Sequence, residues 1–284
     1  MKFLQIKSMK LREYRARMLK LEDNKFQSTQ SLEKYIWKNI EKKIPIYGSD
    51  VRGSLMRGWE SSWNLNDLDS VLNDGLKPLK LSGINVPYLY FGGFRNMFSW
   101  HCEDLNMCSI NYHHFGKPKF WYAIDKTDHK KFKKLLNKLF PKSRKKCDEY
   151  IRHKLTVVNP YVIKKLDPSI GIKKFKQEPG QFILTMCGGF HMGFNAGFNI
   201  NEAVNFCVPE WLSIFPFQKK CLCQKNNLWI NNWEFYSKLK SSGKYDELDE
   251  FRTFERILFK RFGIDGVERP KRISKRKRKF KNRT

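Results

Sequence analysis

The sequence lacks long hydrophobic runs and is poor in acidic residues and in cysteine. No stretch reaches the roughly 18 to 20 consecutive apolar residues of a membrane-spanning helix, and residues 1–15, MKFLQIKSMKLREYR, are too charged for a secretory signal. Seven cysteines, an odd number among 284 residues, do not resemble a disulfide framework. These absences predict an intracellular chain without a membrane anchor, whose thiols are reduced or bound to metal.

Acidic residues number only 28 against 56 basic ones, which gives a formal net charge of +28. The end of the chain, KRISKRKRKFKNRT at 271–284, contains no acidic residue. This imbalance predicts a polyanionic partner, namely nucleic acid or chromatin, and a location in the nucleus. A disordered tail that only keeps the protein in solution is the alternative reading of residues 265–284.

Hydrophobic periodicity divides the remaining chain into three parts. Residues 1–44 have helical spacing, residues 45–215 consist mainly of short aromatic and β-branched runs, and residues 216–264 are helical again. The central part is typical of an all-β barrel or sandwich. Strands are expected in YLYFGGF, MFSWH, SINYHHFG, FWYAI, LTVVNP, QFILTM and AVNFCV. Helices are expected around 67–72, at 130–140, near Trp229, Trp233 and Tyr236, and at 248–258.

Two short motifs could together hold a metal ion. In the run WHCED, His101 and Glu103 are alternate residues, so in a strand both side chains point to the same side. His191 in GGFHMG follows an apolar run and could supply a third ligand from another strand. Two histidines and one carboxylate form the metal site of non-haem iron(II) oxygenases. By itself His-x-Glu is common, and a single histidine is more often an ordinary buried residue.

Longer motifs strengthen this hypothesis. They are PIYGSDVRGS (45–54), NVPYLYFGGF (85–94), FSWHCED (98–104), SINYHHFGKPKFWYAI (109–124), CDEYIRHK (147–154) and GFHMGFNAGFNINEAVNF (189–206). With these motifs, residues 45–223 resemble the JmjC oxygenases. Among them they resemble the zinc-containing histone trimethyl-lysine demethylases that carry a JmjN segment ahead of JmjC. The chain is expected to lack JmjN, since its first residues resemble the linker helix before the JmjC domain.

The resemblance implies a mostly β fold with flanking helices: a double-stranded β-helix, or cupin-like jelly roll, between helical N- and C-terminal segments. It implies iron(II) held by His101, Glu103 and His191, with 2-oxoglutarate as cosubstrate. The implied reaction is demethylation of di- or trimethylated lysine on the histone H3 tail, lysine nine foremost, with release of formaldehyde and succinate. A JmjC hydroxylase of another basic protein, or a catalytically dead chromatin-binding module, remains an alternative.

The resemblance also assigns residues to the two organic ligands. Lys119 and Tyr47 would bind the distal carboxylate of 2-oxoglutarate, Asn111 would bind its keto-acid end, and Phe98 and Trp121 would form apolar walls. An unpaired carboxylate in a dry cleft would be costly, and a lysine ammonium offsets that cost. The methyl-lysine pocket would be formed by Gly83, Tyr88, Tyr90, Glu103 and Asn205, whose oxygen atoms can make weak C–H contacts. Ala203 and Val204 replace two small hydroxyl residues that are common in the family, and Val204 is expected to remove a polar group from the pocket.

A second metal site follows from the same resemblance. Cys147, His153, Cys221 and Cys223 correspond to a Cys3His site for structural zinc that clamps residues 216–264 onto the barrel. The Cys-x-Cys spacing is unusual for zinc, so spacing alone leaves four unconnected residues as an alternative. Cys102, Cys108, Cys187 and Cys207 lie in apolar segments and are interpreted as small core residues.

Overall fold

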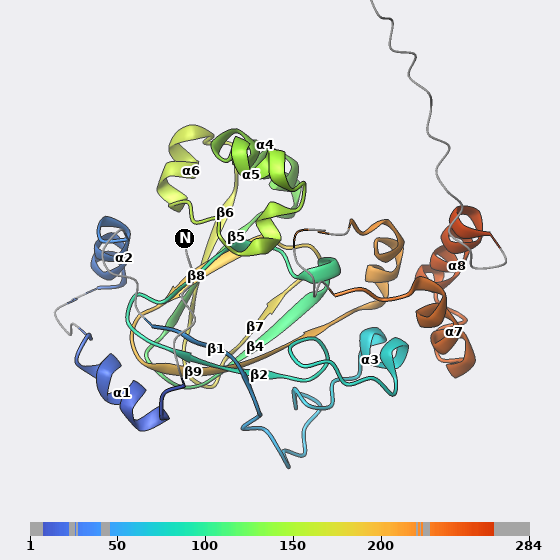
Figure 1. Cartoon of the computed structure of the whole chain (residues 1–284), viewed down its shortest axis with the longest axis horizontal. Helices are drawn as coiled ribbons and strands as arrows, with labels where there is room; N and C mark the ends of the chain where they lie inside the picture. The colour runs from blue at the N-terminus through green and yellow to red at the C-terminus, as the bar shows by residue number, and fades with distance from the viewer. Residues whose placement is uncertain are drawn as a thin grey trace, which may run out of the picture.

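Two antiparallel β-sheets face each other in the computed structural model, which describes residues 8–22, 26, 28–40, 46–219, 221, 223 and 228–263 (Figure 1). The larger sheet has the strand order β1-β2-β9-β4-β7, and the smaller has β3-β8-β5-β6. Because β7, β8 and β9 alternate between the sheets, the expected jelly-roll fold is confirmed. The strands are β1 Gly48–Arg52, β2 Tyr88–Gly92, β3 Met97–His101, β4 Cys108–Gly116, β5 Lys119–Ile124, β6 Ile172–Gln177, β7 Phe182–Thr185, β8 His191–Asn195 and β9 Asn199–Phe206.

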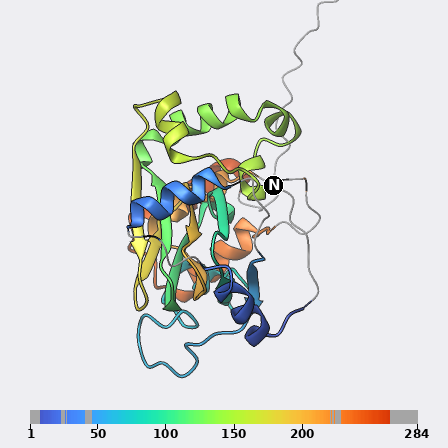
Figure 2. The same ribbon diagram turned by 90° about the vertical axis from the view of Figure 1, so that its left-hand side faces the viewer.

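Helices surround the sheets rather than filling the space between them. The α-helices are α1 Leu11–Leu19, α2 Thr29–Lys38, α3 Val71–Leu76, α4 His129–Leu139, α5 Pro141–Lys146, α6 Pro160–Leu166, α7 Asn232–Ser242 and α8 Asp249–Phe262. Short 3-10 helices are η1 Asp104–Asn106, η2 Lys126–Asp128, η3 Tyr150–His153, η4 Pro209–Ser213 and η5 Phe215–Phe217. Figure 2 shows the α4–α6 region along one edge of the barrel. None of the described helices is long and apolar enough to cross a lipid bilayer.

The largest hydrophobic core lies on the outer face of the smaller sheet. Trp100, Tyr122 and Phe194 from its strands pack with Ile36 of α2 and Phe132 of α4. In β5 and β8 these positions alternate with residues that face the larger sheet, because successive side chains in a strand point to opposite faces. In β3 the register shifts between Phe98 and His101, so Trp100 faces outward although Phe98 faces inward. The helices therefore bury the apolar face of the sheet, and the inner face is left for polar and functional side chains.

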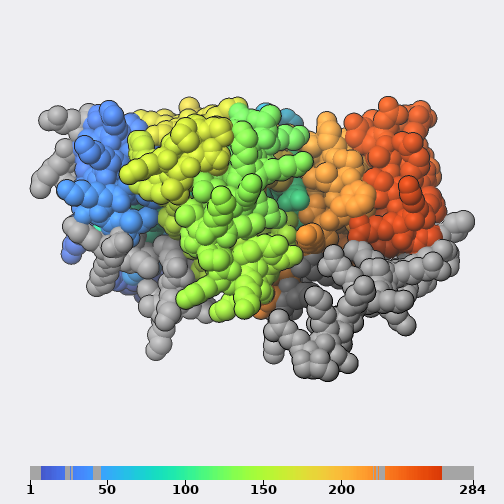
Figure 3. Space-filling view, turned by 90° about the horizontal axis from the view of Figure 1, so that it is seen from above, coloured from blue at the N-terminus to red at the C-terminus, as the bar shows by residue number. Residues whose placement is uncertain are grey.

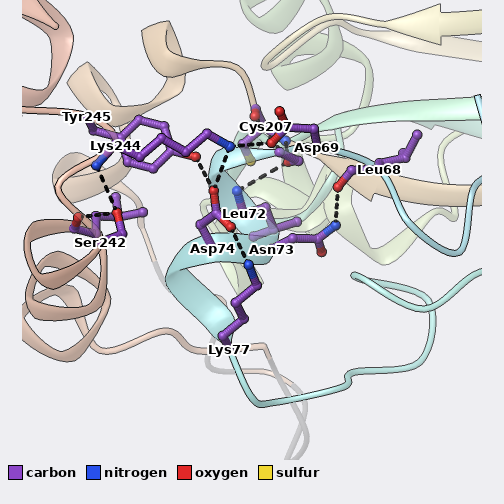
Figure 4. Close-up of polar contacts among 12 residues, drawn as sticks. Leu68, Asp69, Leu72, Asn73, Asp74, Lys77, Cys207, Ser242, Lys244 and Tyr245 are labelled. Carbon is purple, nitrogen blue, oxygen red and sulfur yellow. Dashed lines mark hydrogen bonds and ion pairs between the residues drawn. The ribbon is translucent and has the colours of Figure 1, made fainter. Parts of the chain in front are cut away.

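The C-terminal helices share a second core with α3 and the 3-10 helices around the barrel end. Trp211, Phe235 and Phe254 are fully buried in it. Polar contacts fasten the same junction: Asp74 in α3 accepts hydrogen bonds from Lys244 (3.1 Å) and from the Tyr245 hydroxyl (Figure 4). Seen from above, α4–α6 lie between the N-terminal helices and this C-terminal part (Figure 3).

The positions of two predicted elements were wrong. The helix expected at 67–72 spans Val71–Leu76, because the Ser70 hydroxyl caps it by accepting a hydrogen bond from the Leu72 amide at 3.2 Å. Trp229 lies before α7, whose N-cap is Asn231. That asparagine accepts hydrogen bonds from two amides of the first turn and so fixes where the helix begins.

One predicted strand is absent from the described structure, and two observed strands, β1 and β6, were not predicted. LTVVNP at 155–160 is not a strand; Trp100 donates its amide to the Thr156 carbonyl at 2.9 Å and its indole N–H to the Val158 carbonyl at 2.9 Å. Conversely, β6 pairs with β5 along its whole length. Its sequence, IKKFKQ, contains three lysines and does not resemble a typical strand. The lysines are tolerated because β6 is an edge strand that exposes most of its side chains to solvent.

Candidate active site

His101, Glu103 and His191 come together where β3 ends and β8 begins. His101 and His191 are cross-strand partners in the smaller sheet. Glu103 lies beyond the end of β3, as the N-cap of η1, so the prediction that it shares a strand with His101 was wrong. Its backbone is still extended (φ −64°, ψ 156°), which preserves the alternation of side chains. One ligand atom from each of the three residues lies within 4.8 Å of the other two.

Backbone carbonyl groups fix the orientation of both imidazole rings. Nδ1 of His101 donates to the Ser99 carbonyl at 2.7 Å, and Nδ1 of His191 donates to the Gly189 carbonyl at 3.0 Å. Because a carbonyl oxygen only accepts, Nδ1 carries the proton and Nε2 carries the lone pair. The two Nε2 atoms lie 3.8 Å (His101) and 3.4 Å (His191) from Oε1 of Glu103. Three electron-pair donors therefore converge on one point.

The protonation states of the triad suit a divalent cation. Burial, with the neighbouring His191 and Lys154, holds the pKa of His101 well below its ordinary value of 6.5. Burial alone would raise the pKa of Glu103, but its interaction with His191 and the charge of Lys154 hold it well below its ordinary value of 4.5. A neutral imidazole and an ionised carboxylate are the forms that bind metal. Two histidines and one carboxylate fit iron(II).

Beside the triad lies a buried lysine. Lys119 is only 3% exposed, and its ammonium is 3.3 Å from the Tyr47 hydroxyl. The Nζ atom also lies over the rings of Phe98 and Trp121, 4.8 and 5.3 Å from their centroids. Burial lowers the pKa of Lys119 from 10.5 to about 7, and none of the ion pairs among the described residues includes it. An ammonium buried among aromatic rings and a hydroxyl group provides a binding point for an anionic ligand.

Gly193 makes room for these aromatic walls. It lies between Phe98 of β3 and Trp121 of β5, with which it pairs in register. A Cβ atom at this position would be 2.4 Å from the Phe98 ring and 2.0 Å from the Phe120 carbonyl oxygen. Any side chain here would displace the Phe98 ring or the neighbouring strand. The glycine thus keeps the ring of Phe98 beside Lys119 and Trp121.

Asn111 is held on the inner face of the larger sheet by two other amides. Its Oδ1 accepts hydrogen bonds of 3.2 Å from both Gln177 and Asn201. Gln177 is fully buried and also accepts a 2.9 Å hydrogen bond from the Trp121 indole, so it links the two sheets. The sequence analysis did not single out Gln177. The available signal was a neutral amide at the end of the lysine-rich run IKKFKQ.

The residues expected to line the methyl-lysine pocket are distributed across β2, β9 and adjoining segments. Ala203 pairs with Tyr88 on one side and with Asn111 on the other, so the three side chains share the inner face. Tyr90 lies two residues further along β2 on the same face, and its hydroxyl donates to Asp50 at 3.3 Å. Gly83 packs so closely against Tyr88 that an added Cβ would lie 2.4 Å from its ring, and Asn205 Nδ2 donates to the Cys108 carbonyl at 3.0 Å.

Val204 does not face the barrel interior, so the expectation that it removes a polar group from the pocket was wrong. Its side chain is buried among Met56, Leu65 and Ile110 on the outer face of the larger sheet. The physical reason is the alternation of β9, which turns Ala203 inward and Val204 outward. Of the two departures from the family pattern, only Ala203 lies on the side of Tyr88 and Asn111.

Cys147, His153, Cys221 and Cys223 form a second cluster of potential ligands, with all four ligand atoms within 4.8 Å of one another. Sγ of Cys147 is 3.6 Å from Sγ of Cys221, and Nε2 of His153 is 3.0 Å from that same sulfur. Three thiols and an imidazole at these separations fit a closed tetrahedral zinc site. The cluster joins η3 to the segment after η5.

Arg152, which the sequence analysis did not single out, connects this cluster with the triad. It is adjacent to His153, and its guanidinium donates to the Glu103 carbonyl at 2.5 Å and to Asn106 Oδ1 at 2.9 Å. An ion pair with Glu149 (3.1 Å) fixes the other side of the guanidinium. Arg152 therefore connects the backbone of Glu103 and η1 to residues 147–153, the segment that contains Cys147 and His153 of the second cluster.

Comparison with known proteins agrees with this geometry. Residues 88–206 match the family described as "JmjC domain, hydroxylase". Residues 88–206 therefore form a JmjC domain, which runs from β2 to β9 and has the jelly-roll fold described above.

Within the family, the chain is similar to lysine-specific demethylases. It is 36% identical over 253 residues to lysine-specific demethylase 4B of Mus musculus, covering 88% of this chain and 23% of the relative. It is 40% identical over 197 residues to lysine-specific demethylase 4D of Rattus norvegicus, with coverages of 68% and 38%. It is 38% identical over 222 residues to the probable lysine-specific demethylase 4F of Homo sapiens, with coverages of 76% and 34%. The chain thus spans less than two fifths of the length of these relatives.

Proposed function

We propose that the protein demethylates di- or trimethylated lysine on the histone H3 tail, with iron(II) at His101, Glu103 and His191 and with 2-oxoglutarate as cosubstrate. The observation that supports the proposal most strongly is the burial of the Lys119 ammonium beside the triad, where a ligand carboxylate would neutralise its charge. A dicarboxylate that also binds the metal would satisfy both groups at once. The three relatives named above are lysine-specific demethylases by name, which supports lysine as the residue acted on.

In this proposal each residue near the metal has one task. Bound iron(II) would supply, with dioxygen and 2-oxoglutarate, the oxidation of an N-methyl group, with succinate and formaldehyde as products. Lys119 and Tyr47 would bind the distal carboxylate of the cosubstrate; burial raises the pKa of Tyr47, which keeps its hydroxyl protonated and able to donate. Asn111 would orient the keto-acid end, while Phe98 and Trp121 exclude water.

The methylated ammonium would enter along the inner face of β2 and β9. The hydroxyls of Tyr88 and Tyr90, the carbonyl of Gly83, the side chain of Asn205 and the carboxylate of Glu103 would surround it with oxygen atoms. Burial and the nearby Asp50 raise the pKa of Tyr90, so its hydroxyl stays neutral. A neutral, oxygen-rich pocket permits a methyl group to approach the metal, whereas an aromatic cage would hold the ammonium in place.

Mass spectrometry of histone H3 peptides tests the proposal. Peptides di- or trimethylated at lysine nine, incubated with the protein, iron(II), ascorbate and 2-oxoglutarate, should lose methyl groups as formaldehyde and succinate accumulate. The variant His191→Ala should keep its circular dichroism spectrum and lose all turnover. Peptide hydroxylation without demethylation would favour the JmjC hydroxylase alternative. Absence of succinate with every peptide would favour the catalytically dead chromatin-binding module.

We also propose that Cys147, His153, Cys221 and Cys223 hold structural zinc, which clamps residues 216–264 onto a catalytic barrel formed by residues 45–215. The contacts among the three sulfur atoms and the imidazole support this, because several thiols packed together are stabilised as thiolates by a cation. Elemental analysis should find about one zinc per chain. Cys221→Ser should lose that zinc, and folded wild-type protein free of zinc would disprove the site.

A lysine-rich surface supports contact with chromatin. Residues 130–146 of α4 and α5 carry nine lysines and arginines and no acidic residue, and Figure 3 shows these helices on the outer surface. We propose that this face binds nucleic-acid phosphates and that the protein acts in the nucleus; the basic tail at 265–284 lies outside the described residues. Replacing Lys134, Lys138 and Lys142 by Gln should weaken DNA binding and flatten its salt dependence. An unchanged salt slope would contradict this assignment.

A further inference from the structure

Three cysteines that belong to neither metal cluster gather where the barrel meets the C-terminal helices. Cys108 is the first residue of β4, Cys187 lies in the turn between β7 and β8, and Cys207 directly follows β9. The sulfur atoms of Cys108 and Cys187 are 2.6 Å apart. Cys108 is fully buried, whereas Cys187 is half-buried and reaches the surface.

The local structure holds these two thiols together. The pair of residues next to these cysteines in the sheet is Ser109 of β4 and Thr185 of β7. The two residues are in register, and their hydroxyl oxygens are 2.6 Å apart. The turn that carries Cys187 is itself closed: the Gly189 amide donates to the Met186 carbonyl at 2.8 Å. The two sulfur atoms therefore meet between a regular strand pair and a hydrogen-bonded turn, and not in an unconstrained loop.

We propose that Cys108 and Cys187 form a reversible disulfide when the protein meets hydrogen peroxide. The Cys187 thiolate attacks the peroxide, the O–O bond breaks, and a sulfenic acid and a hydroxide ion form; the hydroxide takes up the proton that the thiol released to solvent and leaves as water. The Cys108 sulfur then attacks the Cys187 sulfur, the S–O bond breaks, and a second water leaves with the Cys108 proton. Two thiols and one peroxide thus give one disulfide and two waters, and a dithiol reverses the reaction. Bond formation requires the sulfur atoms to move by less than about 1 Å.

Electrostatics assigns the roles of the thiols. The hydrogen bond from Cys108 is the main cause that lowers the pKa of Cys187, and the same bond together with burial raises the pKa of Cys108. Burial raises the pKa of Cys207 well above its ordinary value of 9.0. Cys187 is therefore both the most accessible and the most reactive of the three, Cys108 is placed to resolve its sulfenic acid, and Cys207 is a bystander.

The crosslink would fasten a part of the fold that supports the active site. The β7–β8 turn carries the Gly189 carbonyl that accepts the proton of His191 Nδ1, and the Cys108 carbonyl accepts a hydrogen bond from Asn205. A bond between Cys108 and Cys187 would join this turn to β4 with little movement. We therefore expect oxidation to preserve the site, to stabilise the fold, and to divert Cys187 from irreversible oxidation.

Peptide mapping of the full-length, zinc-loaded chain tests the proposal. The protein is treated with equimolar hydrogen peroxide, quenched with catalase, alkylated with N-ethylmaleimide under denaturing conditions and digested. A peptide linking Cys108 and Cys187 is expected, with Cys102 and Cys207 alkylated, and dithiothreitol should remove the link. The melting temperature should rise by about 4 °C or more on oxidation, because the bond closes a long loop.

Matched variants separate this disulfide from general oxidation. Cys207→Ser should retain the crosslink, whereas Cys108→Ser should lose it and, when treated with two or more equivalents of peroxide, accumulate sulfinic acid at Cys187. If Cys108→Ser fails to fold, Cys187→Ser serves instead and should leave Cys108 as an alkylatable thiol. A Cys187–Cys207 link, a sulfinic acid at Cys187 of the wild type without any link, or unmodified Cys187 would each overturn the proposal.

Discussion

Lys119 allows the proposed cosubstrate site to be tested through its pH dependence. Its pKa of about 7 results from burial, and a bound carboxylate would restore the charged form. At pH 6 nearly all free protein carries the ammonium, whereas at pH 8 about one molecule in eleven does. We predict that the Kd of 2-oxoglutarate rises about tenfold from pH 6 to pH 8 and about tenfold more from pH 8 to pH 9. Each step corresponds to about 1.4 kcal/mol of binding free energy.

The same shift affects the stability of the ligand-free protein. Between the folded pKa of about 7 and the ordinary value of 10.5, the unfolded chain binds more protons at this lysine than the folded one. The free energy of unfolding therefore rises with pH in this window, and below pH 7 the full penalty of about 5 kcal/mol applies. Lys119→Met, which keeps the apolar stem, should stabilise the ligand-free protein at pH 7 by up to that amount while weakening 2-oxoglutarate binding.

Isothermal titration calorimetry under anaerobic conditions measures the binding, with manganese(II) in place of iron. Metal affinity is measured separately at each pH, so that titration of the triad does not enter the result. Lys119→Met is the control and should show weak, pH-independent binding. A Kd of 2-oxoglutarate that is constant from pH 6 to pH 9 in the wild type, or a lower melting temperature of ligand-free Lys119→Met at pH 7, would refute the assignment of Lys119.

Three further predictions concern the walls and supports of the site. Gly193→Ala should weaken 2-oxoglutarate binding by at least about tenfold, since its Cβ would displace Phe98; calorimetry that finds wild-type affinity would contradict this. Arg152→Met should lower metal affinity and turnover by about 1 to 3 kcal/mol, because it leaves the Glu103 carbonyl without its charged donor; unchanged metal titrations would disprove the link. Ala203→Ser should change the preference between di- and trimethylated peptides, whereas Val204→Thr should only destabilise the fold by about 1 to 3 kcal/mol. Equal effects of these two variants on preference would show that our assignment of the inner face is wrong.

The main features of the fold could be predicted from local patterns, whereas the triad also required the longer motifs that resemble the JmjC oxygenases, because His191 is distant in sequence from His101 and Glu103. Alternating aromatic runs gave most of the strands, and His101 and Glu103 lie two residues apart in extended backbone. The orientation of Val204 was also predictable, since Asn205 and Val204 cannot point to the same side of one strand.

Gln177 and Arg152 were beyond sequence reasoning for a different reason. Both act through backbone carbonyls or amides of distant segments: Gln177 donates to the Asn111 carbonyl at 3.0 Å, and Arg152 donates to the Glu103 carbonyl. Every residue has a backbone carbonyl group, so the amino-acid type at the accepting position gives no signal for such a contact, and no sequence motif predicts it. Their flanking sequences, rich in lysine and arginine, further resemble solvated surface.

The arrangement of the core explains how a polar interior is compatible with a stable fold. Trp100, Tyr122 and Phe194 turn away from the space between the sheets and are buried beneath helices. The inward positions of the same sheets can therefore carry groups such as Asn111 and Lys119, whose burial without a ligand is unfavourable. Burial of apolar side chains at roughly 25 cal/mol per Å² on the outer face offsets that cost. The outer faces of the strands thus contribute stability and the inner faces contribute the chemistry. A substitution at an outward position should therefore change stability, and one at the neighbouring inward position should change activity.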